Sequence, residues 1–263
     1  MGGAARPAGG PSATAIAGPR REDRSHGSLS TAWAIWSDTG SAWTLALSVV
    51  RALVAEGARV TAAARKVTPR LAELGDAVTQ VAVDLTTPAG ADLLAAQAGP
   101  TDILVNNLGG VTDDSMRSQG FLAIPDESWQ RTFELNLFSA VRVTRALLPG
   151  LLERRGVVIT ISSIGARAAF QPVDYGTAKA ALTNLSKALA EEFGARGLRA
   201  LTVSLGPTRT RNWADEDGYA GQLARANGAT LDEFLAEVPA RMGITTGRLT
   251  EPAETAALVA FLA

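Results

Sequence analysis

Short apolar runs alternate with longer amphipathic segments from Thr31 to the end of the chain, and this alternation most constrains the fold. Parallel strands need crossover connections, usually helices, and strands covered on both faces read as nearly continuous apolar runs. The pattern therefore predicts an α/β domain with one doubly wound parallel sheet. We expect strands near residues 31–37, 58–63, 78–83, 102–106, 156–162 and 199–204. The clearest expected helices cover residues 42–55, 88–98, 126–152, 173–196 and 251–262.

The predicted domain covers residues 31–263. A chain of 263 residues of which 46% are hydrophobic is long and apolar enough for one large core. Residues 1–30 are rich in Ala, Gly, Pro, Arg and Ser without apolar periodicity, which predicts a disordered tail. Residues 205–248 form the least regular stretch, and we expect them to make a mobile lid over the substrate site.

Charge and composition exclude several classes of function. The net charge is −1, so no basic surplus favours nucleic acid or a membrane surface as a partner. There is no cysteine and a single histidine, His26, which argues against thiolate chemistry, histidine triads and a metal site. No apolar stretch in the tail is long enough for a signal peptide, and we expect a cytoplasmic protein.

Tyr175 and Lys179 lie four residues apart at the start of the helix expected over 173–196. Residues at this spacing share one helix face, so the phenol and the ammonium group can converge on one site. A nearby positive charge favours phenolate and should lower the pKa of Tyr175 toward working pH. The same spacing also occurs on ordinary solvated helix faces. Here, however, the pair follows a strand, at the sheet edge where open α/β sheets bind ligands.

The first strand, the turn at Thr39 and Gly40, the helix over 42–55 and the second strand form a dinucleotide-binding pattern. Arg65 and Lys66 follow the second strand. Basic residues at this position suit a 2′-phosphate, whereas an acidic residue would suit a ribose 2′-hydroxyl, so we expect NADP rather than NAD. A solvated basic turn is the alternative interpretation.

Seven short motifs in this order resemble the short-chain dehydrogenase/reductase family over residues 31–263. They are Thr39-Gly40, Asp84, the segment 106–109 (NNLG), Asn136, Ser162-Ser163, Tyr175 with Lys179, and Gly206 with Thr210. The resemblance implies a Rossmann-type sheet, a nicotinamide cofactor, and hydride transfer between a carbonyl compound and an alcohol. The partner would be a small carbonyl or alcohol substrate.

The resemblance also implies roles for the catalytic set. Tyr175 would be the general acid/base, Lys179 would lower its pKa and hold the nicotinamide ribose, and Asn136 would support a proton relay. A serine would hydrogen-bond the substrate oxygen. Ser162 has the family's usual spacing to the tyrosine and Ser163 has the motif position. Only one can face the site, because adjacent strand residues point to opposite faces, and we expect Ser163.

By the same resemblance, a larger set would contact the cofactor. Asp84 would meet the adenine, and Thr208 and Thr210 the nicotinamide carboxamide and phosphates. The alternatives are a strand-end cap at Asp84, a turn at Asn107 and Gly109, and a helix N-cap at Thr210. The full expected set is Gly40, Arg65, Asp84, Leu85, Asn107, Gly109, Tyr175, Lys179, Thr208 and Thr210.

Two departures from the family pattern put activity in doubt. Thr44 and Ala46 replace glycines of the phosphate loop, where added side chains should hinder approach to a pyrophosphate. The family's last strand, which would follow the final helix, is not found before Ala263, which also weakens the expectation of a homo-oligomer.

Other functions therefore remain open. One alternative is a non-catalytic or impaired binding protein of this fold, and another is epimerisation or dehydration by the same Tyr-Lys pair. The expected pocket walls, residues 110–125 and 205–248, contain Phe121, Leu122, Ile124, Trp213, Tyr219 and Phe234, which would form an apolar pocket or a packed lid.

Overall fold

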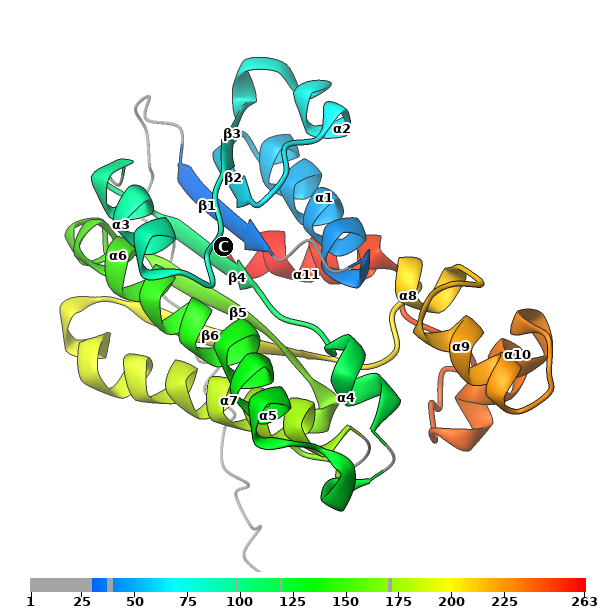
Figure 1. Ribbon diagram of the computed structural model, residues 1–263. Coiled ribbons are helices and arrows are strands. Elements are labelled where there is room, and N and C mark those ends of the chain that lie inside the picture. Colours follow the sequence, from blue (N-terminus) through cyan, green and yellow to red (C-terminus); the bar gives the residue numbers. More distant parts are fainter. Residues whose placement is uncertain (1–29, 37–39, 98, 119, 170–171) are drawn as a thin grey trace, which may run out of the picture.

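Six parallel strands form one sheet in the order β3-β2-β1-β4-β5-β6 (Figure 1). The computed structural model describes residues 30–263 except 37–39, 98, 119 and 170–171. The expected tail of residues 1–30 thus lies outside the described residues, apart from Ser30. The strands are β1 (Thr31–Trp36), β2 (Arg59–Ala64), β3 (Val78–Ala82), β4 (Ile103–Asn107), β5 (Val157–Ser163) and β6 (Arg199–Leu205). All six expected strands are confirmed, with ends shifted by at most one residue.

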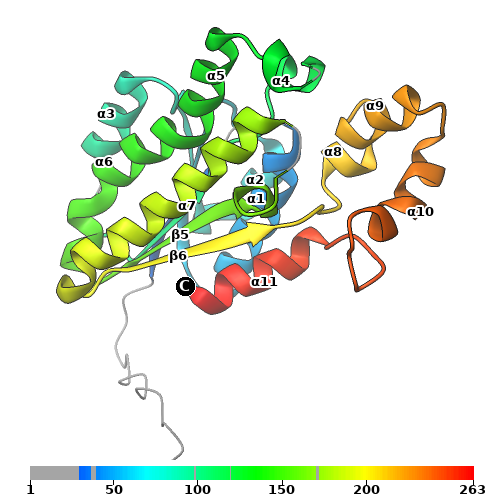
Figure 2. The same cartoon turned by 90° about the horizontal axis from the view of Figure 1, so that it is seen from below.

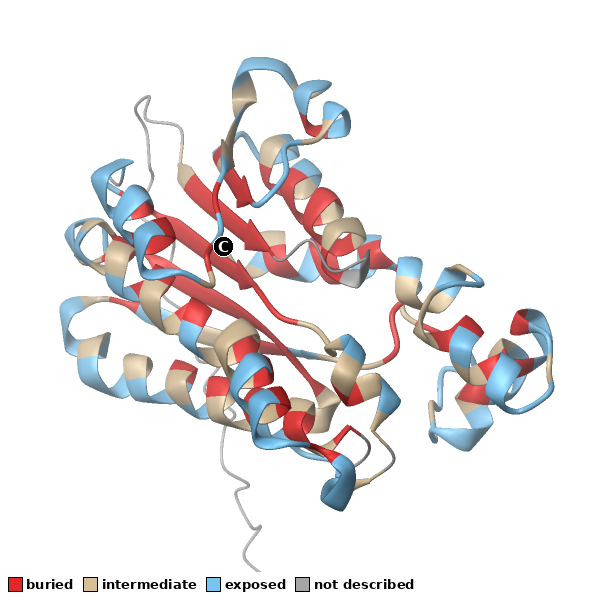
Figure 3. Ribbon diagram, viewed as in Figure 1, coloured by how far each residue is buried: buried red, intermediate tan, exposed pale blue. Residues whose placement is uncertain are grey.

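The strand order reverses beside β1, which pairs with β2 on one side and with β4 on the other. A polar group at the carboxyl end of either neighbour therefore faces the same crevice, which is where ligands bind in open α/β sheets. The central strands are buried on both faces, as their uninterrupted apolar sequence predicts (Figure 3). The sheet is therefore a rigid base for the groups at its edge.

Helices cover both faces of the sheet (Figure 2). In β1, Ala32, Ala34 and Trp36 pack into one apolar cluster with α1 (Gly40–Ala55) and α11 (Pro252–Leu262). The alternate residues Trp33 and Ile35 pack into a second cluster on the opposite face. That face carries α3 (Pro88–Gln97), α6 (Ser139–Glu153) and α7 (Val173–Phe193). The period of two along the strand thus divides the core into two halves.

The helix expected over 126–152 is interrupted near its middle. It consists of α5 (Asp126–Phe133), a π-helical turn η3 (Glu134–Phe138) and α6. The continuous segment Asp126–Glu153 is long and apolar enough to cross a membrane by length and composition alone. Its apolar residues Val143, Leu147 and Leu151 are buried against the sheet, so this helix belongs to the protein core.

The stretch expected to be an irregular lid folds into three helices instead. They are α8 (Arg211–Ala214), α9 (Tyr219–Ala226) and α10 (Leu231–Arg241). They project beyond the carboxyl ends of the strands and share a small apolar core of their own (Figure 1). Thr230 and Glu233 form a capping box that starts α10. The prediction of irregular structure was wrong because apolar residues spaced at helical intervals bury a face here.

The remaining elements are short. They are α2 (Pro69–Ala72), α4 (Asp113–Arg117) and the 3-10 turns η1 (Gly75–Ala77), η2 (Phe121–Ala123), η4 (Ile164–Ala166) and η5 (Gly194–Arg196). Of these, α4 and η4 lie next to the functional site described below.

Candidate active site

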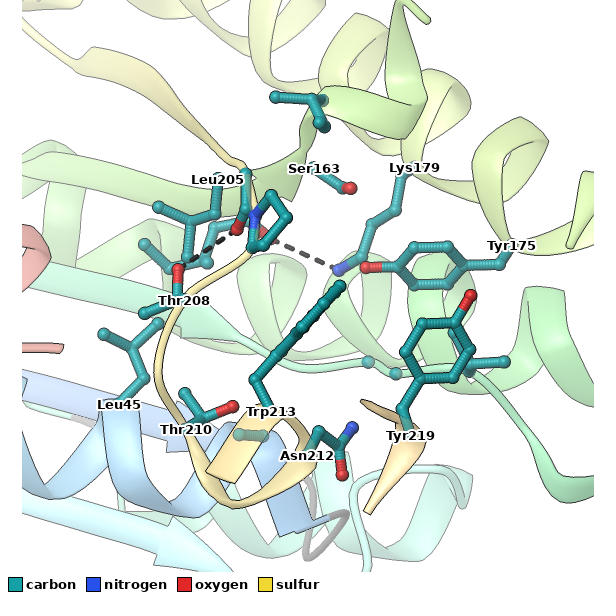
Figure 4. A pocket seen from close by; sticks show the side chains of 18 of the residues that line it. Leu45, Ser163, Tyr175, Lys179, Leu205, Thr208, Thr210, Asn212, Trp213 and Tyr219 are labelled. Carbon is teal, nitrogen blue, oxygen red and sulfur yellow. Dashed lines mark hydrogen bonds between the residues drawn. The ribbon is translucent and has the colours of Figure 1, made fainter. Parts of the chain in front are cut away.

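One cavity of about 420 Å³ lies at the carboxyl ends of the central strands, between the sheet and the lid helices (Figure 4). Its floor comes from the first turns of α1, the segment after β4, the end of β5 and the start of α7. Leu205 and the loop after β6 close one side, and residues of α8 to α10 close the other. Six of the predicted site residues line it, beside Ser163: Asn107, Gly109, Tyr175, Lys179, Thr208 and Thr210.

Tyr175 and Lys179 converge as their spacing predicts. The Lys179 ammonium lies 5.9 Å from the centre of the Tyr175 ring, and the Tyr175 hydroxyl forms a hydrogen bond with the Ser163 side chain. Three elements of acid-base chemistry, a phenol, a cation and a hydroxyl, therefore meet at one point in the cavity.

The pKa of Tyr175 shifts in the opposite direction to the expected one. Burial raises the pKa of this phenol, and the hydrogen bond with Ser163 offsets that only in part. Lys179 was expected to lower it, but desolvation of the phenolate is the larger effect. In the protein as described, Tyr175 is therefore a neutral phenol at neutral pH.

Lys179 is only 4% exposed and is held by the ends of two strands. Its ammonium donates hydrogen bonds to the carbonyl oxygens of Leu108 (3.0 Å) and Ile161 (3.3 Å). Burial nevertheless lowers the pKa of Lys179 to about 8. The hydrogen bonds thus fix the position of the ammonium group, while its pKa lies close to neutral pH.

The two serines at the end of β5 have different surroundings. Ser163 bonds with Tyr175 and also accepts a hydrogen bond from the Gly165 amide at 3.1 Å. The Ser162 hydroxyl instead lies 2.8 Å from the Thr183 hydroxyl and donates to the Lys179 carbonyl at 3.2 Å. Ser163 is therefore the serine whose hydroxyl meets the phenol, on the side that the strand alternation predicts.

Asn136 lies in the π-helical turn and is fully buried. Its amide nitrogen donates to the carbonyl oxygens of Gly110 and Thr132, and its amide oxygen accepts from the Gly110 amide. Gly109 beside it has φ +118°, and a Cβ there would lie 2.2 Å from the Asn136 amide oxygen and 2.7 Å from the Lys179 nitrogen. Only glycine fits this position.

The segment expected to bind phosphates begins outside the described residues, at Thr39. Gly40 starts α1, and the Asn107 amide donates to the Ala42 carbonyl at 3.0 Å, which ties the end of β4 to the first turn of α1. Ala46, which replaces a family glycine, is buried in the core between α1 and the sheet. Its methyl group is therefore accommodated where α1 packs on the sheet, and the expected hindrance to a pyrophosphate stays a prediction.

The residues expected to recognise the adenine end do not line the cavity. Asp84 accepts hydrogen bonds from the Thr86 amide and hydroxyl, which together with the positive charge of Arg65 lower its pKa. This is the turn-capping geometry that was the alternative interpretation for Asp84. The Leu85 side chain is buried in the core, so only its backbone is left to contact a cofactor.

Thr208 and Thr210 follow β6, and both are buried at the cavity wall. The Thr208 hydroxyl donates to the Gly206 carbonyl at 3.1 Å, and the Thr208 backbone bridges to Thr250. Thr210 occupies the N-cap position of α8, yet its side chain makes no capping hydrogen bond. Its hydroxyl is thus available to the cavity rather than to the helix.

The predicted walls are correct only in part. Trp213, Tyr219 and Phe234 line the cavity, whereas Phe121 and Leu122 are 61% and 97% exposed and Ile124 is buried elsewhere. Leu45 and Pro172 also line the cavity and lie outside the two expected wall ranges, whereas the other wall residues not named from the sequence lie within them: Val111, Met116, Leu205, Leu223, Val238 and Met242. For three of them, helical spacing from Tyr219 and Phe234 was an available signal.

A switch-point crevice in a parallel sheet, here with Tyr175 beside the buried Lys179, defines a class of dinucleotide-binding α/β protein. A family model described as enoyl-(acyl carrier protein) reductase matches residues 40–263. The chain is 34% identical over 196 residues to 2-keto-3-deoxy-L-fuconate dehydrogenase of Xanthomonas campestris, a match covering 73% of the chain and 61% of that enzyme. It is 31% identical over 236 residues to the 3-oxoacyl-acyl-carrier-protein reductase FabG of Salmonella typhimurium, covering 86% and 87%.

Among solved structures, L-sorbose reductase from Gluconobacter frateurii complexed with NADPH and L-sorbose has a TM-score of 0.75 and 31% identity, with 89% of both chains covered. The chain belongs to the short-chain dehydrogenase/reductase family. The relatives are oxidoreductases, which supports an enzyme of this kind with a nicotinamide cofactor.

Proposed function

We propose that the protein interconverts a ketone or aldehyde and an alcohol with NADP as the cofactor and Tyr175 as the general acid/base. One observation carries the proposal. The Tyr175 hydroxyl bonds with Ser163, and the buried Lys179 ammonium lies 5.9 Å from the centre of the Tyr175 ring in the same cavity. A carbonyl oxygen held at the two hydroxyl groups could accept a proton as it gains negative charge.

The cavity fits a nicotinamide cofactor at several points. Gly109 leaves open a position that a Cβ would fill, and the Thr210 hydroxyl is free of its helix. Asn107, Gly109, Thr208 and Thr210 would hold the cofactor along the strand ends. When bound, it supplies the hydride. Arg65 supports NADP over NAD, because its guanidinium suits a 2′-phosphate.

The chain's own residues would handle the proton. Ser163 would orient the substrate oxygen and Tyr175, neutral because of its raised pKa, would donate to it during reduction. Loss of that proton leaves a phenolate, which the neighbouring Lys179 charge stabilises. Asn136, fixed by Gly110 and Thr132, would support a water-linked path for the replacement proton.

The test is NADPH oxidation, followed by absorbance over a panel of ketones, with the wild-type protein and Tyr175→Phe. General acid-base catalysis contributes about 10²–10⁴-fold, so the phenylalanine variant should lose at least about 100-fold in kcat while it still binds NADPH. Turnover that survives in Tyr175→Phe would show that another group transfers the proton.

A second candidate is a non-catalytic binding protein of the same fold. It is favoured by Thr44 and Ala46, which stand where the family has phosphate-loop glycines. Titration with NADPH separates the two, since tight binding contradicts an impaired cofactor site. Cytoplasmic location, a homo-oligomer and the absence of nucleic-acid or membrane partners stay predictions.

A further inference from the structure

The lid presents an almost continuous apolar wall to the cavity. Trp213 and Tyr219 pack edge to face, with ring centres 5.7 Å apart and an interplanar angle of 68° (Figure 4). Helices α9 and α10 add Leu223, Phe234 and Val238 to the wall, and Met242 adds to it from the C-cap of α10. The opposite side carries Val111, Met116 and Pro172. A molecule whose carbonyl reaches Tyr175 would thus have its remaining atoms among apolar side chains.

The wall residues are anchored by the lid's own core. Phe234 and Val238 are buried in the apolar cluster that joins α9 to α10, and Trp213 and Leu223 pack against that cluster. The helical spacing of four residues places Phe234 and Val238 on one side of α10, and Met242 follows at the C-cap of the helix. The wall is therefore a packed surface with a fixed shape, which suits selection among substrates.

Few polar groups of the lid face the cavity. Asn212 contributes an amide and Tyr219 a hydroxyl. Burial raises the pKa of Tyr219, so this phenol stays neutral and can donate one hydrogen bond. Arg241 also lies at the cavity, but it is largely exposed and paired with Glu237 at 2.6 Å. Apart from the catalytic set and the residues proposed to hold the cofactor, the described walls thus offer few hydrogen-bonding side chains to a substrate.

We propose that the substrate is a ketone whose carbonyl carries an apolar group, either an aromatic ring or an alkyl chain. This apolar group packs against Trp213. This inference rests on the proposed carbonyl reduction at Tyr175 and narrows its substrate. A polyhydroxylated ketone is disfavoured, because each hydroxyl that exchanges water for an apolar wall loses its hydrogen bonds. Each such loss lowers affinity by about 10-fold.

The first experiment compares kcat/KM for acetophenone with that for L-sorbose, the ketohexose named in the structure of the similar reductase, under saturating NADPH. Two unsatisfied hydroxyl groups predict a preference for acetophenone of about 100-fold or more. Equal efficiencies, or a preference for L-sorbose, would overturn the inference.

The second experiment tests the wall itself. Trp213→Ala should raise KM for acetophenone by about 10- to 100-fold and change kcat less, because it removes contact with the apolar group but not with the carbonyl. Leu122→Ala is the matched control, since Leu122 is 97% exposed and lies outside the cavity lining. If Trp213→Ala does not fold, judged by its thermal transition, Trp213→Leu replaces it. An unchanged KM in a folded variant contradicts the proposal.

The experiments distinguish a wrong oxidoreductase function from a wrong substrate class. If NADPH does not bind, the proposed oxidoreductase is wrong, and with it the inference. If NADPH binds and L-sorbose is reduced better than acetophenone, the inference alone is wrong. If NADPH binds but neither ketone turns over, equilibrium binding to the NADPH complex decides. Acetophenone should then bind more tightly than L-sorbose, and Trp213→Leu should abolish the difference.

Discussion

Gly109 is a residue at which the backbone passes close to Asn136 and Lys179. Its φ of +118° and the distances that a Cβ would make, 2.2 Å to the Asn136 amide oxygen and 2.7 Å to the Lys179 nitrogen, make any side chain costly. Gly109→Ala should therefore destabilise the protein by about 2–4 kcal/mol and displace Lys179.

The matched control for that substitution is Gly57→Ala. Gly57 has φ +83° with nothing within 4 Å of an added Cβ, so it carries the backbone strain without the clash. We expect a cost of about 1 kcal/mol there. Urea unfolding measures both variants, and equal losses would show that the crowding at Gly109 has no energetic effect.

The lowered pKa of Lys179 predicts how the free energy of unfolding changes with pH. Its pKa is lowered from 10.5 to about 8 by burial. Between these pH values the unfolded chain holds a proton that the folded protein has released, so the free energy of unfolding rises with pH. Below pH 8 both states are charged, and the burial penalty of about 3 kcal/mol is constant.

Lys179→Met removes this titration. The stability of the variant minus that of the wild type should fall by about 3 kcal/mol as the pH rises from 7 to 10.5. Denaturant unfolding at four or five pH values measures the difference. A difference independent of pH would contradict a lowered pKa for Lys179.

At the scale of elements, one buried carboxylate joins three helices. Asp174, in the first turn of α7, is fully buried. It accepts hydrogen bonds from the Thr132 hydroxyl of α5 at 2.7 Å and from the Ser115 hydroxyl of α4. The Thr132 carbonyl in turn accepts from Asn136. The start of the helix that carries Tyr175 is thereby tied to α4 and to the π-helical turn.

Asp174→Ala should destabilise the protein by about 3 kcal/mol, because two buried hydroxyl groups lose a charged acceptor. Asp174→Asn keeps one oxygen acceptor and should cost less. Asp76→Ala, at an exposed aspartate in another helical first turn, should stay within about 0.5 kcal/mol of the wild type. Urea unfolding should show the largest loss of stability for Asp174→Ala, a smaller loss for Asp174→Asn and almost none for Asp76→Ala. Equal losses for Asp174→Ala and Asp76→Ala would contradict this prediction.

At the scale of the whole molecule, cofactor binding should couple the sheet to the lid, because residues of both line one cavity. A ligand at about 100 times its Kd stabilises the folded state by about 2.7 kcal/mol. For a protein of this size that should raise Tm by about 5–10 °C with NADPH.

Arg65→Ala tests the basis of cofactor choice in the same measurement. The variant should lose much of the NADPH shift and keep the smaller NADH shift, since only NADPH carries the 2′-phosphate. Thermal denaturation with each cofactor at equal concentration measures this. Equal losses with both cofactors would show that Arg65 does not discriminate between them.

The order of elements and the local geometry of the catalytic residues could be predicted from the amino-acid sequence. Both follow from short-range periods, two residues in a strand and about four in a helix. The strand alternation separates Ser162 from Ser163, and the helical spacing brings Tyr175 and Lys179 to one point. The lid helices carry the same helical spacing of apolar residues, although the glycines and mixed charges around them favour irregular structure.

How the site is solvated, and which groups share it, depends instead on the packing of segments that are distant in the sequence. The pKa of Tyr175 rises because elements from several parts of the chain exclude water, and no local pattern encodes that. Long-range packing also buries the Leu85 side chain in the core and leaves Leu122 exposed. It likewise brings Trp213 to the cavity, opposite the strand ends. Desolvation depends on all the neighbours at once, whereas periodicity reports only those along the chain.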